Sequence, residues 1–285
     1  MPDRYFEIED GTLVVTGPWT EAAGEELARP ETRTLTLNYA LGFEGFDVEF
    51  IDSDWDLDRL NVLDRGILDA SPIERQTSLR DLSVQAAPGV ELDLAALPDL
   101  ESFGGEWSLI AGSFAGATSL RKLITWIFTE PDLRAFRDHV ALEHLEIKEA
   151  RRLGALDGIE ALPSLARLSV ALSRQLEHLE PISELAGSLR QFDFSHCPMV
   201  SSIAPVASLE GLEVFGCSES RDIDSLSPLA ELSSLAVIYA YGTTRIVDGD
   251  LSPLLGLPLD DLRIQSRRSY TPSVAEVKHE LGIDT

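Results

Sequence analysis

The sequence contains only two cysteines among its 285 residues, Cys197 and Cys217. Two thiols cannot build the disulfide framework that holds many small secreted proteins together. No apolar run approaches the roughly 18 residues that a membrane-spanning helix needs. The first ten residues, MPDRYFEIED, lack the basic-then-apolar order of a secretory signal. We therefore expect a cytoplasmic protein that does not insert into a membrane.

Positive charge is also scarce. The chain has 23 lysines and arginines against 49 acidic residues, a formal net charge of −26. Such a field repels nucleic-acid phosphates and anionic lipids, and it attracts basic proteins. Residues 44–58, EGFDVEFIDSDWDLD, hold seven acids and no base. We predict a basic protein partner, with no nucleic acid or membrane; the alternative is that the acids only keep the surface soluble.

Motifs for catalysis and metal binding are missing as well. None of the five histidines stands in H-E-x-x-H, and neither G-x-S-x-G nor a phosphate-binding loop occurs. The nearest cation motif is DSDWDLD at 52–58, but an EF-hand loop needs glycine and glutamate where this segment has Leu57 and Leu63. We predict no catalytic residue, metal or cofactor. A metal-regulated sensor or enzyme built around 52–58 is the less favoured alternative.

A repeated leucine pattern dominates the sequence. Stretches such as SLRDLSVQ, SLRKLITWI and SLARLSVAL align on leucines that are 20 to 26 residues apart, at positions 79, 100, 120, 142, 165, 189, 209, 235 and 259. Two weaker copies begin at Glu31 and Asp56. In L-x-x-L-x-L the last two apolar positions share one face of a strand. One such unit cannot bury its apolar edge alone, so the pattern predicts a stack of repeats.

This pattern resembles the leucine-rich repeat family over roughly residues 30–266. Segments such as LSPLAEL and LEPISEL resemble the short convex turns of internalin-type repeats. The resemblance implies an α/β solenoid, a single horseshoe with about 11 short parallel strands on its concave face. It also implies 3-10 or short helical turns on the convex face, where a proline near the start of each turn is tolerated.

The ends of the chain differ from the repeats, as terminal caps should. We predict an N-terminal cap over 1–55, with a hairpin at 5–17 around EDG and a first irregular repeat. The repeats are predicted over 56–266. A C-terminal capping helix and tail are predicted over 267–285, because TPSVAEVKHELG begins with a Ser/Thr cap and stops at glycine.

Both cysteines lie eight residues after an anchor leucine, Leu189 or Leu209. In the family this position holds a ladder of small polar groups that hydrogen-bond the turns. The resemblance therefore implies two reduced, structural thiols in line with Ala150, Ser173 and Thr243. A disulfide between adjacent rungs would have poor geometry.

The residues that alternate with the core leucines should stand on the concave face. Aromatic side chains there, with acids among them, have the composition of a protein-binding hot spot. The predicted partner-binding residues are Glu106, Trp107, Trp126, His144, Glu146, Asp193, His196, Glu213, Phe215, Tyr239 and Tyr241. The alternative is that the rings pack against neighbouring strands and only stiffen the sheet.

Together these patterns predict a monomeric, non-enzymatic binding module that captures a basic protein. Its most concrete form is an inhibitor or immunity protein against a toxin that acts on nucleic acid. The alternative is an intracellular signalling or assembly scaffold that uses the same surface.

Overall fold

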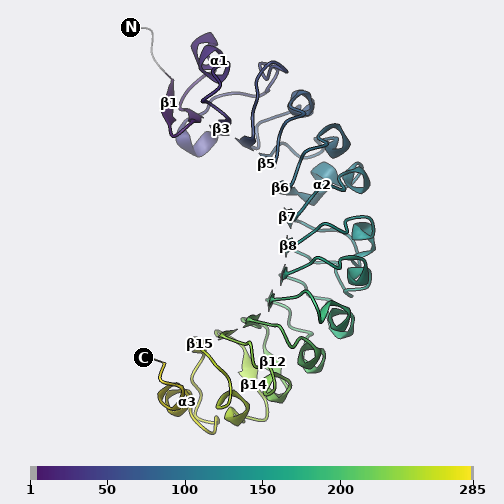
Figure 1. Ribbon diagram of the computed structural model, residues 1–285, viewed down its shortest axis with the longest axis vertical. Coiled ribbons are helices and arrows are strands. Elements are labelled where there is room, and N and C mark those ends of the chain that lie inside the picture. Colours follow the sequence, from purple (N-terminus) through teal and green to yellow (C-terminus); the bar gives the residue numbers. More distant parts are fainter. Residues whose placement is uncertain (1–4, 284–285) are drawn as a thin grey trace. The chain divides into compact units, whose positions relative to one another are not determined.

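The computed structural model describes residues 5–283 and divides into two compact units, Met1–Thr125 and Trp126–Thr285 (Figure 1). The first unit begins with an antiparallel hairpin of β1 (Phe6–Glu9) and β2 (Thr12–Val15). Asp10 and Gly11 form its turn with φ of 47° and 73°. The hairpin predicted around EDG is confirmed.

The rest of the first unit alternates strands with short helical turns. Its elements are α1 (Glu21–Leu27), β3 (Thr34–Asn38), η1 (Tyr39–Leu41), β4 (Arg59–Leu63), η2 (Ser71–Arg75), β5 (Asp81–Gln85), η3 (Leu94–Ala96), β6 (Ser102–Glu106), α2 (Trp107–Ile110) and η4 (Phe114–Gly116). Strand β7 (Lys122–Trp126) crosses the boundary between the units.

Parallel pairing places equivalent apolar residues of the first unit in rows. Leu35 pairs with Leu60, Leu60 with Leu82, and Leu82 with Phe103. All four are buried, and a second buried row begins with Leu37. Because side chains alternate across a strand, the residues between these rows face the opposite side of the sheet. We call that side the strand face.

The second unit continues the alternation. Its elements are η5 (Arg134–Phe136), β8 (His144–Lys148), η6 (Ile159–Ala161), β9 (Arg167–Ala171), η7 (Glu180–Leu185), β10 (Gln191–Ser195), η8 (Ala204–Ser208), β11 (Val214–Gly216), β12 (Asp222–Ile223), η9 (Ser227–Leu229), β13 (Val237–Ala240), β14 (Arg245–Ile246), η10 (Ser252–Leu254), β15 (Asp261–Ile264) and α3 (Val274–Leu281).

The strand count differs slightly from the prediction of about eleven. Among the described residues, thirteen strands follow one another in chain order; two belong to the hairpin and eleven to repeats. The short parallel pair of β12 and β14 was not predicted. Several helical turns of the second unit have the predicted proline near their start, as the second residue of η7 and η9. The predicted alternation of strands and short turns is confirmed.

One repeat is aligned differently from the prediction. Phe192 of β10 pairs with Phe215, and Phe215 pairs with Ile238 of β13. The anchor leucine of this repeat is therefore Leu212, which lies 23 residues from both Leu189 and Leu235. Leu209 was chosen wrongly because Leu209, Leu212 and Val214 also satisfy L-x-x-L-x-L.

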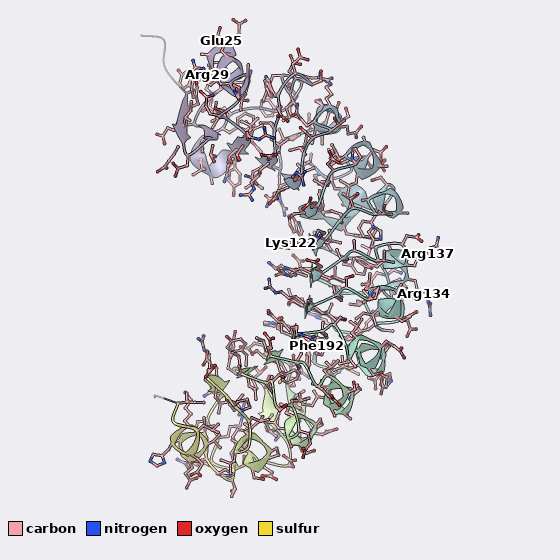
Figure 2. All side chains as sticks on the ribbon, viewed as in Figure 1. Glu25, Arg29, Lys122, Arg134, Arg137 and Phe192 are labelled. Atoms are coloured by element: carbon pink, nitrogen blue, oxygen red, sulfur yellow. The ribbon has the colours of Figure 1, made fainter. Side chains whose placement is uncertain are left out.

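The core of each unit lies between its strands and its helical turns. In the second unit, Phe192 lies in this layer, whereas Arg134 and Arg137 project from the helical side (Figure 2). In the first unit, Lys122 projects from the strand side, Glu25 lies on α1, and Arg29 lies just after that helix (Figure 2). The helical turns therefore cover one edge of the core and leave the strand face open.

A left-handed residue follows each repeat strand from β7 to β13. Its φ lies between 51° and 69° at Ile127, Glu149, Leu172, His196, Glu219 and Gly242. Only one of the six is a glycine, the residue that ordinarily adopts this conformation without strain. The chain turns here from the strand face toward the helical side, along what we call the loop edge. In the first five of these turns the residue two positions later occupies an equivalent place on the loop edge.

The terminal helices cover the ends of the repeats. Helix α3 has a capping box between Ser273 and Glu276 and ends at Gly282, as predicted. Helix α1, capped by Thr20, was not predicted. It buries Ala23 and Leu27, too few apolar positions to give a clear helical period. The predicted boundaries at 55 and 266 stay predictions.

Candidate functional site

A hollow of about 370 Å³ opens on the strand face of the second unit. Gly216 forms its floor, between Asp193 of β10 and Tyr239 of β13 in the pairing register. A Cβ atom at Gly216 would lie 2.7 Å from the Cβ of Asp193, so the close approach of the strands requires glycine. We call this site the Gly216 hollow; its lining also includes Gln191, Ser195, Ser218, Tyr241 and Arg263.

Asp193 supplies the acid of the Gly216 hollow. Its Oδ1 accepts a hydrogen bond from Ser169 Oγ at 2.8 Å, and its Oδ2 accepts one from Gln191 Nε2 at 3.3 Å. Burial raises the pKa of Asp193 above its ordinary value, against the lowering effect of these two bonds. Each carboxylate oxygen has a second acceptor site. Asp193 can therefore accept further hydrogen bonds from a cation that enters the hollow.

Two tyrosines form an aromatic wall. Tyr239 is half-buried and Tyr241 is 49% exposed. The guanidinium of Arg263 lies 5.3 Å from the centre of the Tyr239 ring and pairs with Asp261 at 2.9 Å. The charge of Arg263 is thus already paired with that of Asp261 at the rim of the Gly216 hollow. The hollow combines a partly buried carboxylate with two aromatic faces.

The structure brings together only part of the predicted site. Asp193, Tyr239 and Tyr241 line the hollow. His144 and Glu146 stand on the strand face of β8, where Glu146 pairs with Lys148 at 2.9 Å. The remaining predicted residues lie elsewhere: Trp126 ends β7, Glu106 ends β6 in the first unit, His196 lies in the turn after β10, and Glu213 precedes β11.

The prediction that Trp107 and Phe215 contact a partner is wrong. Trp107 is 2% exposed, because it begins α2 after the strand and its ring meets Phe114 edge-on at 5.1 Å between centres. Phe215 is fully buried, because the true register of its repeat turns it inward against Phe192 and Phe194. For these two rings the alternative of packing inside the protein is correct.

Sequence reasoning missed the residues that shape the hollow, above all Gly216. The sequence contained part of the information needed to find Gly216. With Phe215 placed in the core, Gly216 falls on the strand face between an acid and a tyrosine. Ser169 and Gln191 were on the predicted face, but nothing in the pattern showed that both would hydrogen-bond Asp193.

The predicted polar ladder exists with different members. Cys197 N–H donates to Ser220 Oγ at 3.2 Å, and Ser220 N–H donates to Thr244 Oγ1 at 3.1 Å. Ser173 is also buried, and its hydroxyl donates to the Leu153 carbonyl. The positions of Ser173 and Cys197 are confirmed. Thr244, and not the exposed Thr243, belongs to the ladder because the turn after β13 is one residue longer.

Cys217 does not lie in the ladder. It follows β11 at the second core position of its repeat, as the corrected register requires. Both cysteines are free and buried. Burial raises the pKa of Cys197 to about 11 and that of Cys217 to about 12. Thiols with these pKa values stay protonated near neutral pH and are poor nucleophiles.

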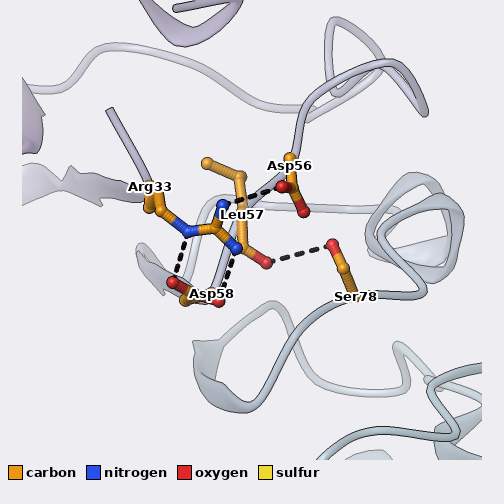
Figure 3. A network of polar contacts seen from close by, with 5 residues as sticks. All are labelled: Arg33, Asp56, Leu57, Asp58 and Ser78. Atoms are coloured by element: carbon orange, nitrogen blue, oxygen red, sulfur yellow. Dashed lines mark hydrogen bonds and ion pairs between the residues drawn. The ribbon is translucent and has the colours of Figure 1, made fainter. Parts of the chain in front are cut away.

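The acidic segment 52–58 pairs with an arginine of the same unit (Figure 3). Arg33 Nη1 donates to Asp56 at 2.7 Å, and Arg33 also forms a two-pronged pair with Asp58. The hydrogen bond from Arg33 lowers the pKa of Asp58. Within residues 5–283, no three histidine, cysteine or acidic side chains gather in a way that could hold a metal ion. No helix in this range has both the length and the apolar character to cross a membrane.

No protein-family model matches the sequence, and no curated protein matches it. Solved structures do match. The internalin InlF of Listeria monocytogenes is 21% identical, over 95% of this chain and 71% of that one, with a TM-score of 0.55. Internalin C2 of the same organism is 16% identical, over 67% and 83% of the two chains, with a TM-score of 0.50.

A structure described as a TDR receptor is 15% identical, over 87% of this chain and 46% of that one, with a TM-score of 0.55. At such identities these likenesses concern the path of the backbone. They agree with the ladder of parallel strands and short turns described above.

Proposed function

Because the chain has a leucine-rich-repeat fold of the internalin-like kind, we propose that it is a non-enzymatic protein-binding module. The strand face of the second unit docks on a basic protein, and the Gly216 hollow receives one of the partner's lysine or arginine side chains. The observation that supports this most is the half-buried carboxylate of Asp193, which lines the same hollow as Tyr239 and Tyr241, across Gly216 from them.

The chemistry of the hollow suits a long cationic side chain. Its apolar stem would lie along the faces of Tyr239 and Tyr241, and a cation over an aromatic ring is attracted by the ring's quadrupole. Its charged end would reach Asp193, which forms no ion pair among residues 5–283 and accepts only the two hydrogen bonds described above. Burial strengthens the attraction between the two charges.

Long-range attraction supports the same partner. A net charge of −26 speeds the approach of a basic protein, and added salt weakens this effect. The most specific form of the proposal is an inhibitor or immunity protein that covers the cationic cleft of a nucleic-acid-cutting toxin. Two buried, unpaired thiols suit a reducing compartment, so we include a cytoplasmic location in the proposal.

The test is capture of partners from a lysate of the source cells by the immobilised chain at low and at high salt. Three baits are compared: the wild type, Asp193→Asn, and the control Glu177→Gln. The control removes the same charge from an exposed turn before η7. We expect a basic protein to bind the wild type and the control at low salt and to be lost from Asp193→Asn.

Retention of no basic protein, or equal retention by Asp193→Asn, would contradict the proposal. If the captured protein is a regulatory component of the cell and not a toxin, the scaffold alternative replaces the inhibitor, while the binding site stands.

A further inference from the structure

A second hollow, of about 380 Å³, lies on the loop edge of the second unit, where the chain leaves the strands. We call it the loop-edge pocket. Its lining includes Arg151, Leu172, Arg174, His196, Glu219 and Arg221. Three arginines against one glutamate make this a locally basic site in a strongly acidic chain.

The arginines recur at one place in the repeat. Arg151, Arg174 and Arg221 each lie two residues after a left-handed residue in the turn that follows a strand. In the repeat between Arg174 and Arg221 the equivalent residue is Pro198, which adds no charge. Rungs of a parallel ladder are about 4.8 Å apart, so the backbones at Arg174 and Arg221 are roughly 10 Å apart. Two arginine side chains can converge across that distance.

Two of these three arginines have no partner among the residues that the structure describes. Arg151 pairs with Glu149 at 3.1 Å. Within residues 5–283, the side chains of Arg174 and Arg221 form no ion pair or hydrogen bond. The one acid of the pocket, Glu219, accepts a hydrogen bond from Thr243 N–H at 3.0 Å, which lowers its pKa. Two guanidinium groups therefore remain free to bind an anion.

We propose that the loop-edge pocket binds a phosphate monoester, held by Arg174 and Arg221. A carboxylate has two oxygens in one plane and is matched by a single guanidinium, whereas a phosphate monoester has three terminal oxygens that can accept from two. Leu172, which is 41% exposed, lines the pocket and would contact the carbon group that carries the phosphate.

The net charge of the protein does not prevent this binding. At physiological salt the Debye length is about 8 Å, so acids on distant surfaces are screened. The charges that act on a bound anion are those lining the pocket. The proposal is independent of the Gly216 hollow, which lies on the strand face and shares no lining residue with the loop-edge pocket.

The test is calorimetric titration of the full chain with phenyl phosphate, with benzoate, and with a short peptide that contains phosphoserine. We expect phenyl phosphate to bind with a Kd of about 1 mM or tighter. Arg174→Gln and Arg221→Gln should each weaken it at least about ten-fold, the effect of losing one charge-assisted hydrogen bond. The control Arg152→Gln removes a neighbouring exposed arginine outside the pocket and should leave binding unchanged.

The three substituted arginines are exposed, so the variants should fold, and far-UV circular dichroism checks this. Tighter binding of the peptide than of phenyl phosphate identifies a protein-borne phosphate, and the reverse order identifies a small molecule; both support the site. The proposal is overturned if neither phosphate ligand binds, if benzoate binds as tightly, or if both pocket variants bind like the wild type.

Discussion

Phe215→Ala should lower the free energy of unfolding by about 3–5 kcal/mol. Phe215 is fully buried, with its ring centre 6.3 Å from that of Phe192 and 6.2 Å from that of Phe194. Removing the ring leaves a cavity between two strands that the surrounding close-packed core can fill only in part. Among the residues first assigned to partner binding, only the buried Trp107 should have a comparable effect on stability.

The control for Phe215→Ala is Tyr241→Ala in the same unit. Tyr241 is 49% exposed on the strand face, so its loss should change stability by no more than about 0.5 kcal/mol. Urea denaturation followed by circular dichroism measures both variants. Similar small losses in the two would show that Phe215 faces solvent and that Leu209 is the true anchor of the repeat.

Asp193→Asn should weaken binding of the captured basic protein by about 2–5 kcal/mol, because it removes one member of a desolvated charge pair. The same change should not destabilise the free protein. Asparagine keeps the shape of the side chain. Its Oδ1 can still accept from Ser169, and its Nδ2 can donate to Gln191 once that amide turns its oxygen toward it. Burial disfavours the charged form of Asp193, so a neutral replacement relieves that cost.

The effect of Asp193→Asn on the free energy of unfolding should depend on pH, and the raised pKa of Asp193 fixes its direction. The folded-state pKa of Asp193 is raised, so its contribution to stability is fully present below the unfolded pKa of about 3.9 and is lost as pH rises through the folded value. The variant should therefore match or exceed the wild type in stability at neutral pH, with the difference shrinking toward pH 4. An Asp193→Asn variant that is less stable than the wild type at neutral pH would contradict the prediction on stability, and one that binds the partner normally would contradict the prediction on binding.

The spacing of leucines predicted most of the fold. It predicted repeat strands such as β9 and β13, because only stacked repeats bury such an edge. The capping signals around Ser273 predicted α3 because they act within one turn of helix. The pattern failed at Leu209, where two alignments satisfy the same spacing. Only the pairing of Phe215 with its neighbours in the ladder separates the two.

The sites were harder to predict because they depend on what neighbouring repeats place side by side. The Gly216 hollow exists because Gly216 has no side chain. A search of the sequence for aromatic and acidic residues does not find such a position. Trp107 follows its strand in sequence but turns inward with α2. The arginines of the loop-edge pocket lie after residues in the left-handed conformation, such as Leu172. The sequence does not indicate this conformation when the residue is not a glycine.

Hydroxyl-radical footprinting of the complex with the captured basic protein tests the docking site most directly. Tyr241 and Met199 are each 49% exposed in the free second unit, and only Tyr241 lines the Gly216 hollow. We expect oxidation of Tyr241 to fall when the partner binds, while oxidation of Met199 stays at the level of the free protein. A Tyr241 that reacts as fast in the complex as in the free chain would show that the partner binds elsewhere.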